Sequence, residues 1–249
     1  MPTEPLLSLV IPTYNERGNL APLIEELRGL LDAAAPGDYE LIVVDDDSPD
    51  RTWELADEIS REFPQVRVLR RAGQRGLSAA VVAGWKIARG KIWGVIDADL
   101  QHPPAVIAPL LAGMRAGADL AVATRHLPGG GVSDWKWSRR VLSRGAQGLA
   151  ALLVPQARLV TDPMSGFFLV RATTIELSRI KPLGYKILLD VLVTGRFAEI
   201  REVPYVFRER TSGGSKVTLQ QYREFVVQIG SLRRQRPTGD VSSALQKLI

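Results

Sequence analysis

Short apolar runs and stretches with helical hydrophobic spacing alternate along the first half of the chain. The apolar runs are bounded by turn residues, as buried strands are, and the stretches between them repeat their apolar positions every three or four residues. The predicted strands are 6–11, 39–44, 66–69, 92–96 and 120–124. The predicted helices are 20–31, 52–62, 77–88 and 104–114, with Asn15 as a candidate N-cap of the first. This alternation predicts an α/β fold with a mostly parallel, doubly wound sheet and helices on both faces.

The pattern changes after Arg125. His126 to Ser133 is rich in glycine, and Trp135 to Val154 places arginines among tryptophan and leucine. The second stretch fits a helix that lies at a membrane interface, and it also fits an ordinary amphipathic helix packed on the sheet. The remaining predicted elements are a strand at 165–170, a helix at 185–194, an extended segment at 200–207 and a helix at 219–232.

Composition narrows the class of protein. Of the 249 residues, 45% are hydrophobic and 24% are charged, which is typical of a globular protein with a sizeable core. The absence of cysteine excludes disulfides and thiolate metal sites. No signal peptide is apparent at Met1 to Ser8 and no apolar run approaches a spanning helix, so we expect a soluble or peripheral chain.

The net charge of +5 favours anionic partners. Nucleic acid is the least favoured of these, because the chain has few aromatic residues interleaved with its basic clusters. The dinucleotide fingerprint and the P-loop motif are both missing, which argues against a nicotinamide enzyme and against a P-loop NTPase.

Carboxylates follow two of the predicted strands. Asp97 and Asp99 come directly after the strand at 92–96, and Asp46 follows the strand at 39–44. Parallel strands open onto the ligand crevice at their carboxyl ends, so these side chains are expected at one edge. Paired carboxylates there favour a hard divalent cation that carries phosphates. Asp45 is expected to be structural. For His102 two roles remain possible, that of a metal ligand and that of a residue at the entry to a helix.

A series of short motifs occurs in a fixed order along the chain. They are P-T-Y-N-E, D-D-x-S-P-D, D-A-D-L-Q-H-P-P, T-R, S-G-F-F, G-Y-K-I-L-L-D, E-V-P-Y and R-x-x-G-x-S-K. Together these motifs resemble those of the family 2 glycosyltransferases, and within them the polyprenol-phosphate (dolichol-phosphate) mannose synthases. The resemblance covers about residues 6 to 232, and one departure is Asp47, which stands where the family usually carries glycine.

The resemblance implies a GT-A-type nucleotide-sugar transferase fold in a single catalytic domain at residues 1–232. Its nucleotide half would span about 1–125 and its acceptor half about 126–232, followed by a polar, flexible tail at 233–249. A divalent cation, Mg²⁺ or Mn²⁺, would be held by Asp97, Asp99 and Gln101. Nucleotide-sugar binding is implied for Pro12, Tyr14, Glu16, Val44, Asp46, Asp97, Ala98, Asp99, Gln101, Arg125, Arg210 and Lys216.

The implied reaction is metal-dependent, inverting transfer of mannose from GDP-mannose to a polyprenyl monophosphate. The acceptor phosphate would be held by Arg139 and Ser143, which with Asp99 and Arg125 form the expected catalytic group. Such a phosphate is already largely dianionic at pH 7 and needs no protein base.

The resemblance further implies a peripheral enzyme at the cytoplasmic face of a membrane, with a membrane surface as partner and no nucleic acid. The need for a separate membrane subunit stays open. Two alternatives also stay open: the same chemistry with UDP-glucose or another nucleotide sugar, and a non-catalytic nucleotide-sugar-binding subunit.

Overall fold

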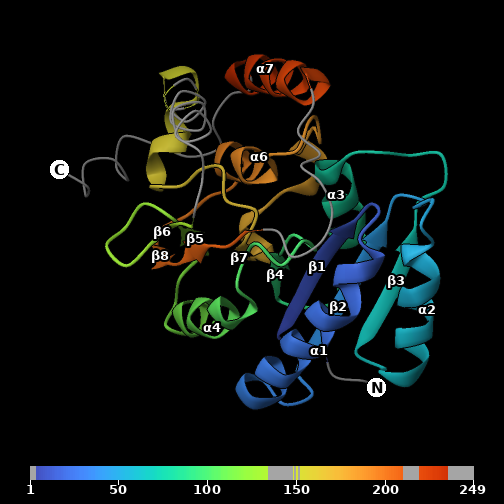
Figure 1. Ribbon diagram of the computed structural model, residues 1–249. Coiled ribbons are helices and arrows are strands. Elements are labelled where there is room, and N and C mark those ends of the chain that lie inside the picture. Colours follow the sequence, from blue (N-terminus) through green and yellow to red (C-terminus); the bar gives the residue numbers. More distant parts are fainter. Residues whose placement is uncertain (1–3, 134–147, 149, 151, 210–218, 235–249) are drawn as a thin grey trace.

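A seven-stranded sheet forms the centre of the molecule (Figure 1). The structure is a computed structural model and describes residues 4–133, 148, 150, 152–209 and 219–234. The strand order is β3-β2-β1-β4-β7-β5-β8. The strands are β1 (Leu7–Thr13), β2 (Tyr39–Asp45), β3 (Val66–Arg70), β4 (Ile92–Val95), β5 (Leu120–Thr124), β7 (Phe168–Arg171) and β8 (Ile200–Pro204).

The pairing confirms the predicted mostly parallel sheet. Only β7 runs against its neighbours β4 and β5, whereas the other neighbours in this sheet pair in parallel. A small second sheet joins β6 (Gly131–Val132) to β9 (Val206–Phe207). Because β4 and β5 both run against β7, they are parallel to each other, and their carboxyl ends reach the same edge.

Helices cover both faces of the sheet, as the sequence predicts. Alternate strand residues face opposite sides: Leu9 and Leu41 pack in one core cluster, whereas Val10 and Ile42 pack in the other. On the first face lie α1 (Arg17–Ala34), α2 (Thr52–Glu62) and α4 (Ile107–Arg115). On the second face lie α3 (Leu77–Ile87) and α6 (Ile187–Thr194).

A third, smaller cluster lies outside α6. There α7 (Leu219–Arg233) packs Phe225 and Ile229 against Leu189, with Ala150 and Val154 beside them. Figure 1 shows α7 lying over α6, on the far side of α6 from the sheet. In the described part of the chain, no helix is both long and apolar enough to cross a membrane.

Most element boundaries lie within two residues of their predicted positions, and the exceptions have local causes. Glu16, which makes no side-chain capping hydrogen bond, occupies the N-cap position of the first helix instead of the candidate Asn15, whose φ of 55° is left-handed. The stretch 104–114 begins as a 3₁₀ turn, Pro104–Val106, before α4 starts. The predicted strand at 165–170 begins only at Phe168, because Ser165 closes a turn onto the carbonyl of Asp162.

Candidate active site

The predicted site residues of the described chain gather at the carboxyl ends of β1, β2, β4 and β5. Three residues just beyond β1, β2 and β4 have left-handed backbones: Asn15 and Asp47 at φ 55° and Leu100 at φ 59°. Such conformations cost free energy in residues other than glycine, and they cluster at functional sites. At Asp47 the carboxylate accepts a hydrogen bond of 2.7 Å from Nε of Arg70, a contact that glycine cannot make.

Asp46 is held by a buried basic partner that sequence reasoning missed. Its Oδ1 accepts hydrogen bonds from Nε and Nη2 of Arg71, and its Oδ2 accepts one of 2.8 Å from the backbone N–H of Gly76. Both side chains are buried. Asp46 therefore sits in a fixed orientation where β2 ends. Arg71 lies in a basic loop without a motif, so the sequence carries no signal for this pair.

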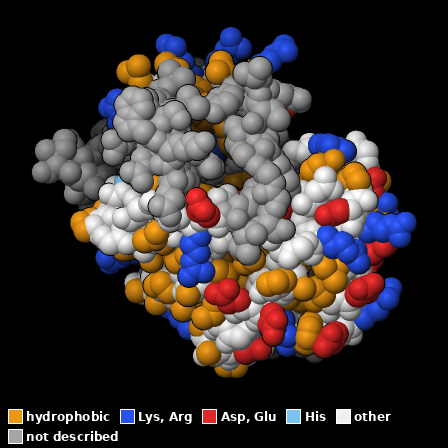
Figure 2. Space-filling view, in the orientation of Figure 1, with side chains coloured by type: hydrophobic (Ala, Val, Ile, Leu, Met, Phe, Trp, Pro, Cys, Tyr) orange, Lys and Arg blue, Asp and Glu red, His pale blue; other side chains and the backbone are white. Residues whose placement is uncertain are grey.

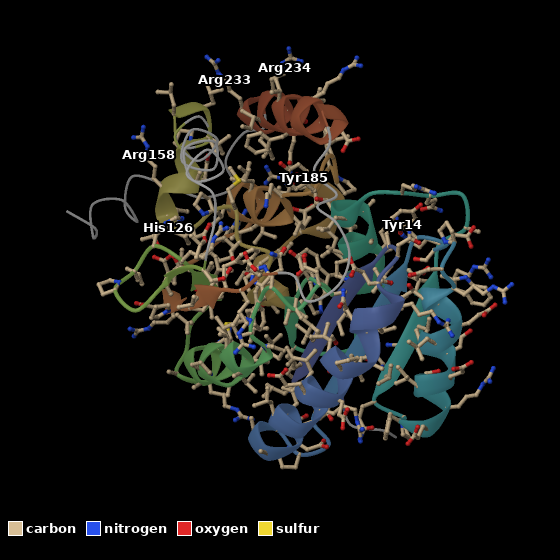
Figure 3. The ribbon with its side chains drawn as sticks, viewed as in Figure 1. Tyr14, His126, Arg158, Tyr185, Arg233 and Arg234 are labelled. Carbon is tan, nitrogen blue, oxygen red and sulfur yellow. The ribbon has the colours of Figure 1, made fainter. Side chains whose placement is uncertain are left out.

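The other expected nucleotide residues divide by side-chain exposure. Tyr14 is partly exposed just after β1 (Figure 3). Its ring lies under the guanidinium of Arg75, whose Cζ is 4.2 Å from the ring centroid. Glu16 is buried and accepts a 2.7 Å hydrogen bond from the amide of Asn19. Pro12 and Val44 are buried within β1 and β2. The side chain of Val44 packs in the α3-side core, so only its backbone remains to meet a ligand.

The D-x-D segment forms an irregular turn after β4. Asp97 is partly exposed, whereas Asp99 is 7% exposed and its Oδ1 accepts a 3.1 Å hydrogen bond from the backbone N–H of Gln101. The amide nitrogen of Gln101 donates to the carbonyl of Arg208 at 3.1 Å. Ala98 is buried in the core. The segment is thus fixed by its own backbone and by the chain that follows β9.

The donor set fits a hard divalent cation. Two carboxylates and one amide oxygen are the oxygen ligands that Mg²⁺ and Mn²⁺ prefer, and either ion keeps waters in its remaining positions. The described residues contain no cluster of three or more His, Cys, Asp or Glu that could hold a metal ion. Gly166 lies against Asp97, since a Cβ there would be 2.9 Å from the carboxylate carbon.

His102 packs among aromatic rings rather than in an open ligand position. Its ring lies 5.1 Å from the centroid of Phe207 and 5.3 Å from that of Tyr205. Its Nε2 is 3.5 Å from Oδ2 of Asp97. This geometry favours a role in which His102 holds the Asp97 side chain in place, a role that the sequence did not indicate.

Arg125 forms a buried bidentate pair with Asp162. Nε donates to Oδ2 at 2.6 Å and Nη2 donates to Oδ1 at 2.8 Å. Burial alone would raise the pKa of the Asp162 carboxyl, but the hydrogen bonds and charge of Arg125 outweigh it and hold that pKa below its usual value. The guanidinium is therefore fixed in orientation, and its charge is balanced by a carboxylate that carries no sequence motif.

A short loop, residues 162–166, connects these groups. Asp162 pairs with Arg125, the carbonyl of Met164 accepts a 3.1 Å hydrogen bond from Nζ of Lys186, and Gly166 abuts Asp97. Lys186 belongs to the G-Y-K-I-L-L-D motif, yet the sequence indicated no role for it. The loop thus links Arg125, Lys186 and the D-x-D segment.

Four expected site residues lie outside the described residues. They are the expected acceptor-phosphate residues Arg139 and Ser143 and the expected diphosphate contacts Arg210 and Lys216. Much of the predicted helix at 135–154 and most of the tail at 233–249 lie outside them as well.

Comparison with known proteins identifies the family. Residues 8–176 match the family model Glycosyl transferase family 2. The chain is 43% identical over 229 residues to a dolichol-phosphate mannosyltransferase of Pyrococcus furiosus, covering 92% of this chain and 64% of that protein. It thus spans just under two thirds of that relative. It is also 38% identical over 238 residues to a polyprenol monophosphomannose synthase of Mycolicibacterium smegmatis, covering 92% and 86% of the two chains.

Solved structures support the fold. Glucosyl-3-phosphoglycerate synthase of Mycobacterium tuberculosis, in complex with Mn²⁺, UDP-glucose and glycerol 3-phosphate, has a TM-score of 0.65 at 20% identity, with 94% and 82% of the chains covered. The predicted GT-A-type fold is confirmed at this level. With its mostly parallel sheet and its family match, the chain belongs to glycosyl transferase family 2.

Proposed function

We propose that this chain transfers mannose from GDP-mannose to a polyprenyl monophosphate, with inversion at the anomeric carbon. The observation that carries the proposal is the strand-end cluster of Asp97, Asp99 and Gln101 beside the Arg125–Asp162 pair. The names of the relatives at 36% to 43% identity support both the sugar and the lipid acceptor.

The donor would bind across the ends of β1, β2 and β4. The Arg71–Asp46 pair presents a fixed polar edge where β2 ends, suited to a nucleotide base. Tyr14, lying under Arg75, offers a partly exposed ring beside it. Asp97, Asp99 and Gln101 would hold Mg²⁺ or Mn²⁺, and the ion would supply positive charge to the diphosphate that leaves.

The acceptor chemistry explains why no general base is needed. A lipid monophosphate has a second pKa near 6, so at pH 7 it is already largely dianionic. One of its oxygens attacks the anomeric carbon, a new C–O bond forms, and the bond to the diphosphate breaks with its electron pair leaving on GDP. Inversion gives a β-linked lipid-phosphate mannose.

An exposed surface on the acceptor half suits a lipid bilayer, and we place the enzyme at the cytoplasmic face of a membrane. On α7 the outward positions are Arg223, Val226, Val227, Gly230 and Arg233, and the exposed Arg234 follows the helix. Val226 is 60% exposed and Val227 53%, and the nearby Leu152 is 70% exposed. Figure 2 shows apolar and basic side chains side by side along this margin of the molecule.

Apolar side chains among arginines are what an anionic membrane surface attracts, at about 1 kcal/mol for each basic group near the surface. Arg158, Arg233 and Arg234 point outward on the same side of the molecule (Figure 3). The lipid acceptor would reach the site from this side.

The variant Asp99→Ala tests the proposed reaction. We expect wild-type protein to move label from GDP-[¹⁴C]mannose into lipid-extractable product in the presence of Mn²⁺ and a polyprenyl phosphate in detergent. The variant should lose this activity by about 100-fold or more, because a main ligand of the diphosphate-binding centre is gone.

Glu58→Ala, at an exposed carboxylate on α2, is the matched control and should keep full activity. Folding is checked by circular dichroism and thermal melting. Full transfer by a folded Asp99→Ala protein would contradict the proposed site.

A further inference from the structure

Among the described residues, the ammonium group of Lys186 uses only part of its hydrogen-bonding capacity. It directly precedes α6, and its Nζ donates one hydrogen bond, 3.1 Å to the carbonyl of Met164. An ammonium has three N–H donors. In the described part of the chain, no carboxylate lies within ion-pair distance of Lys186. Its Nζ lies 4.9 Å from the centroid of the Tyr185 ring.

The ammonium lies within the charge field of the active site. Burial is the main effect on Lys186 and lowers its pKa, the charge of Arg125 lowers it further, and Asp97, Asp162 and Asp99 oppose both. Asp162 already pairs with Arg125 at 2.6 Å, so it is not a direct partner for the lysine. A desolvated cation without a direct counter-ion costs folding free energy. Such a cost is expected where the counter-ion arrives with a ligand.

The position of Lys186 indicates which ligand that is. α6 packs its outer side against α7 and the segment around Ala150, in the cluster under the exposed apolar surface of α7. The nucleotide-side residues Tyr14 and Asp46 instead follow β1 and β2, on the other side of β4 in the sheet order. Lys186 therefore stands between the D-x-D segment and the side from which a lipid would enter.

We infer that the ammonium of Lys186 binds the phosphate of the lipid acceptor, an inference that rests on the proposed function. Two of its N–H groups donate to phosphate oxygens while the third keeps its bond to Met164. The attacking phosphate and the leaving diphosphate are both anionic, so their approach is opposed by repulsion. A compact cation at this point offsets that repulsion.

A purely structural role would be to tether the 162–166 loop through Met164. The two roles make opposite predictions for Lys186→Met, which keeps the length of the side chain and removes the charge. If Lys186 is a structural tether, its loss would destabilise the protein and disturb Asp97 and Arg125 together. Loss of a phosphate ligand would leave the fold about as stable as before, or more stable, because a partly buried charge is removed.

The experiment uses the full chain in detergent with Mn²⁺, with farnesyl phosphate as acceptor probe, farnesol as its phosphate-free match and GDP as donor probe. For Lys186→Met we expect the Kd for farnesyl phosphate and the KM for the acceptor to rise roughly 10- to 100-fold, the loss of a hydrogen bond to a charged group. The Kd for GDP should stay within about twofold, and Tm should not fall. Lys181→Met, at an exposed lysine five residues earlier, should change none of these values.

Unchanged acceptor affinity in Lys186→Met would overturn the inference. A variant that unfolds, or that loses affinity for GDP and for the acceptor together, would also overturn it, because this is the result expected of a structural tether. Wild-type protein that binds farnesyl phosphate no more tightly than farnesol would overturn it as well. Lys186-dependent binding of farnesyl phosphate in a protein that transfers no mannose would support the inference while refuting the proposed function.

Discussion

Gly166 illustrates how single residues shape this site. Its backbone needs no left-handed geometry, but an added Cβ would overlap the carboxylate of Asp97. Glycine is required here because the backbone at residue 166 approaches the side chain of Asp97 closely. The sequence motif S-G-F-F contains this glycine, yet it cannot reveal that the facing group is Asp97.

The variant Gly166→Ala should therefore push Asp97 out of place. We expect kcat/KM for transfer to fall about 10- to 100-fold, as for loss of a group that orients a metal ligand, with little change in the far-ultraviolet circular dichroism. Gly29→Ala is the control: it lies in α1 with no atom within 4 Å of the added Cβ. It should raise stability by about 0.5–1 kcal/mol and leave activity unchanged. Equal activity in both variants would contradict the close approach.

Sequence reasoning worked at this scale where a residue acts through its place on a strand. Asp45 was expected to be structural, and its buried carboxylate accepts hydrogen bonds from Thr13 and Ser48. The partner of Arg125 was not predictable, because Asp162 lies 37 residues away and its placement depends on the tertiary fold.

At the scale of elements, the contact between α6 and α7 contains a buried acid. Asp190 is 1% exposed, and its Oδ2 accepts a 2.6 Å hydrogen bond from the amide of Gln228, which also donates to the carbonyl of Lys186. Oδ1 of Asp190 and Oε1 of Gln228 have no partner among the described residues. Burial raises the pKa of Asp190 to about 7, and the Gln228 bond opposes this only in part.

This pKa makes stability depend on pH. In the unfolded chain the carboxyl loses its proton near pH 4, whereas in the folded protein it keeps it until about pH 7. Folding is therefore favoured less as pH rises from about 4 to 7, and the deficit remains above 7.

The variant Asp190→Asn should remove that deficit. At pH 8 its Tm should exceed that of the wild type, and its free energy of unfolding should be higher by up to about 4 kcal/mol. Both differences should shrink towards pH 4. Thermal melts at pH 4.5, 6 and 8 measure this, with Asp57→Asn on α2 as control. A gain that is constant across pH, or one that grows as pH falls, would contradict the buried neutral acid.

The elements themselves were largely predictable, because their hydrophobic periods are strong. The helix at 52–62 was predicted with the bounds that α2 has. The antiparallel direction of β7 could not be predicted, since an apolar run has the same period in either direction. The reversal matters for the site: it brings the 162–166 loop, at the amino end of β7, to the edge where β4 and β5 end.

At the scale of the whole molecule, segments from early and late in the chain meet at that edge. The ends of β1, β2 and β4 come from the first part of the chain, and α6, the 162–166 loop and the exposed apolar and basic surface of α7 come from the second. The sequence predicted the family, and the division into a nucleotide half and an acceptor half remains a prediction. The expected acceptor residues Arg139 and Ser143, outside the described residues, remain predictions.

A donor comparison is the most direct measurement of the proposed transfer of mannose to a lipid phosphate. GDP-[¹⁴C]mannose and UDP-[¹⁴C]glucose are offered in parallel with a polyprenyl phosphate and Mn²⁺, each with and without chelator, and the label in the lipid phase is counted. We expect label in the lipid phase from GDP-mannose alone, and we expect this label to be lost on chelation. Label from UDP-glucose alone would contradict the assigned donor, and no label from either donor would contradict the assigned reaction.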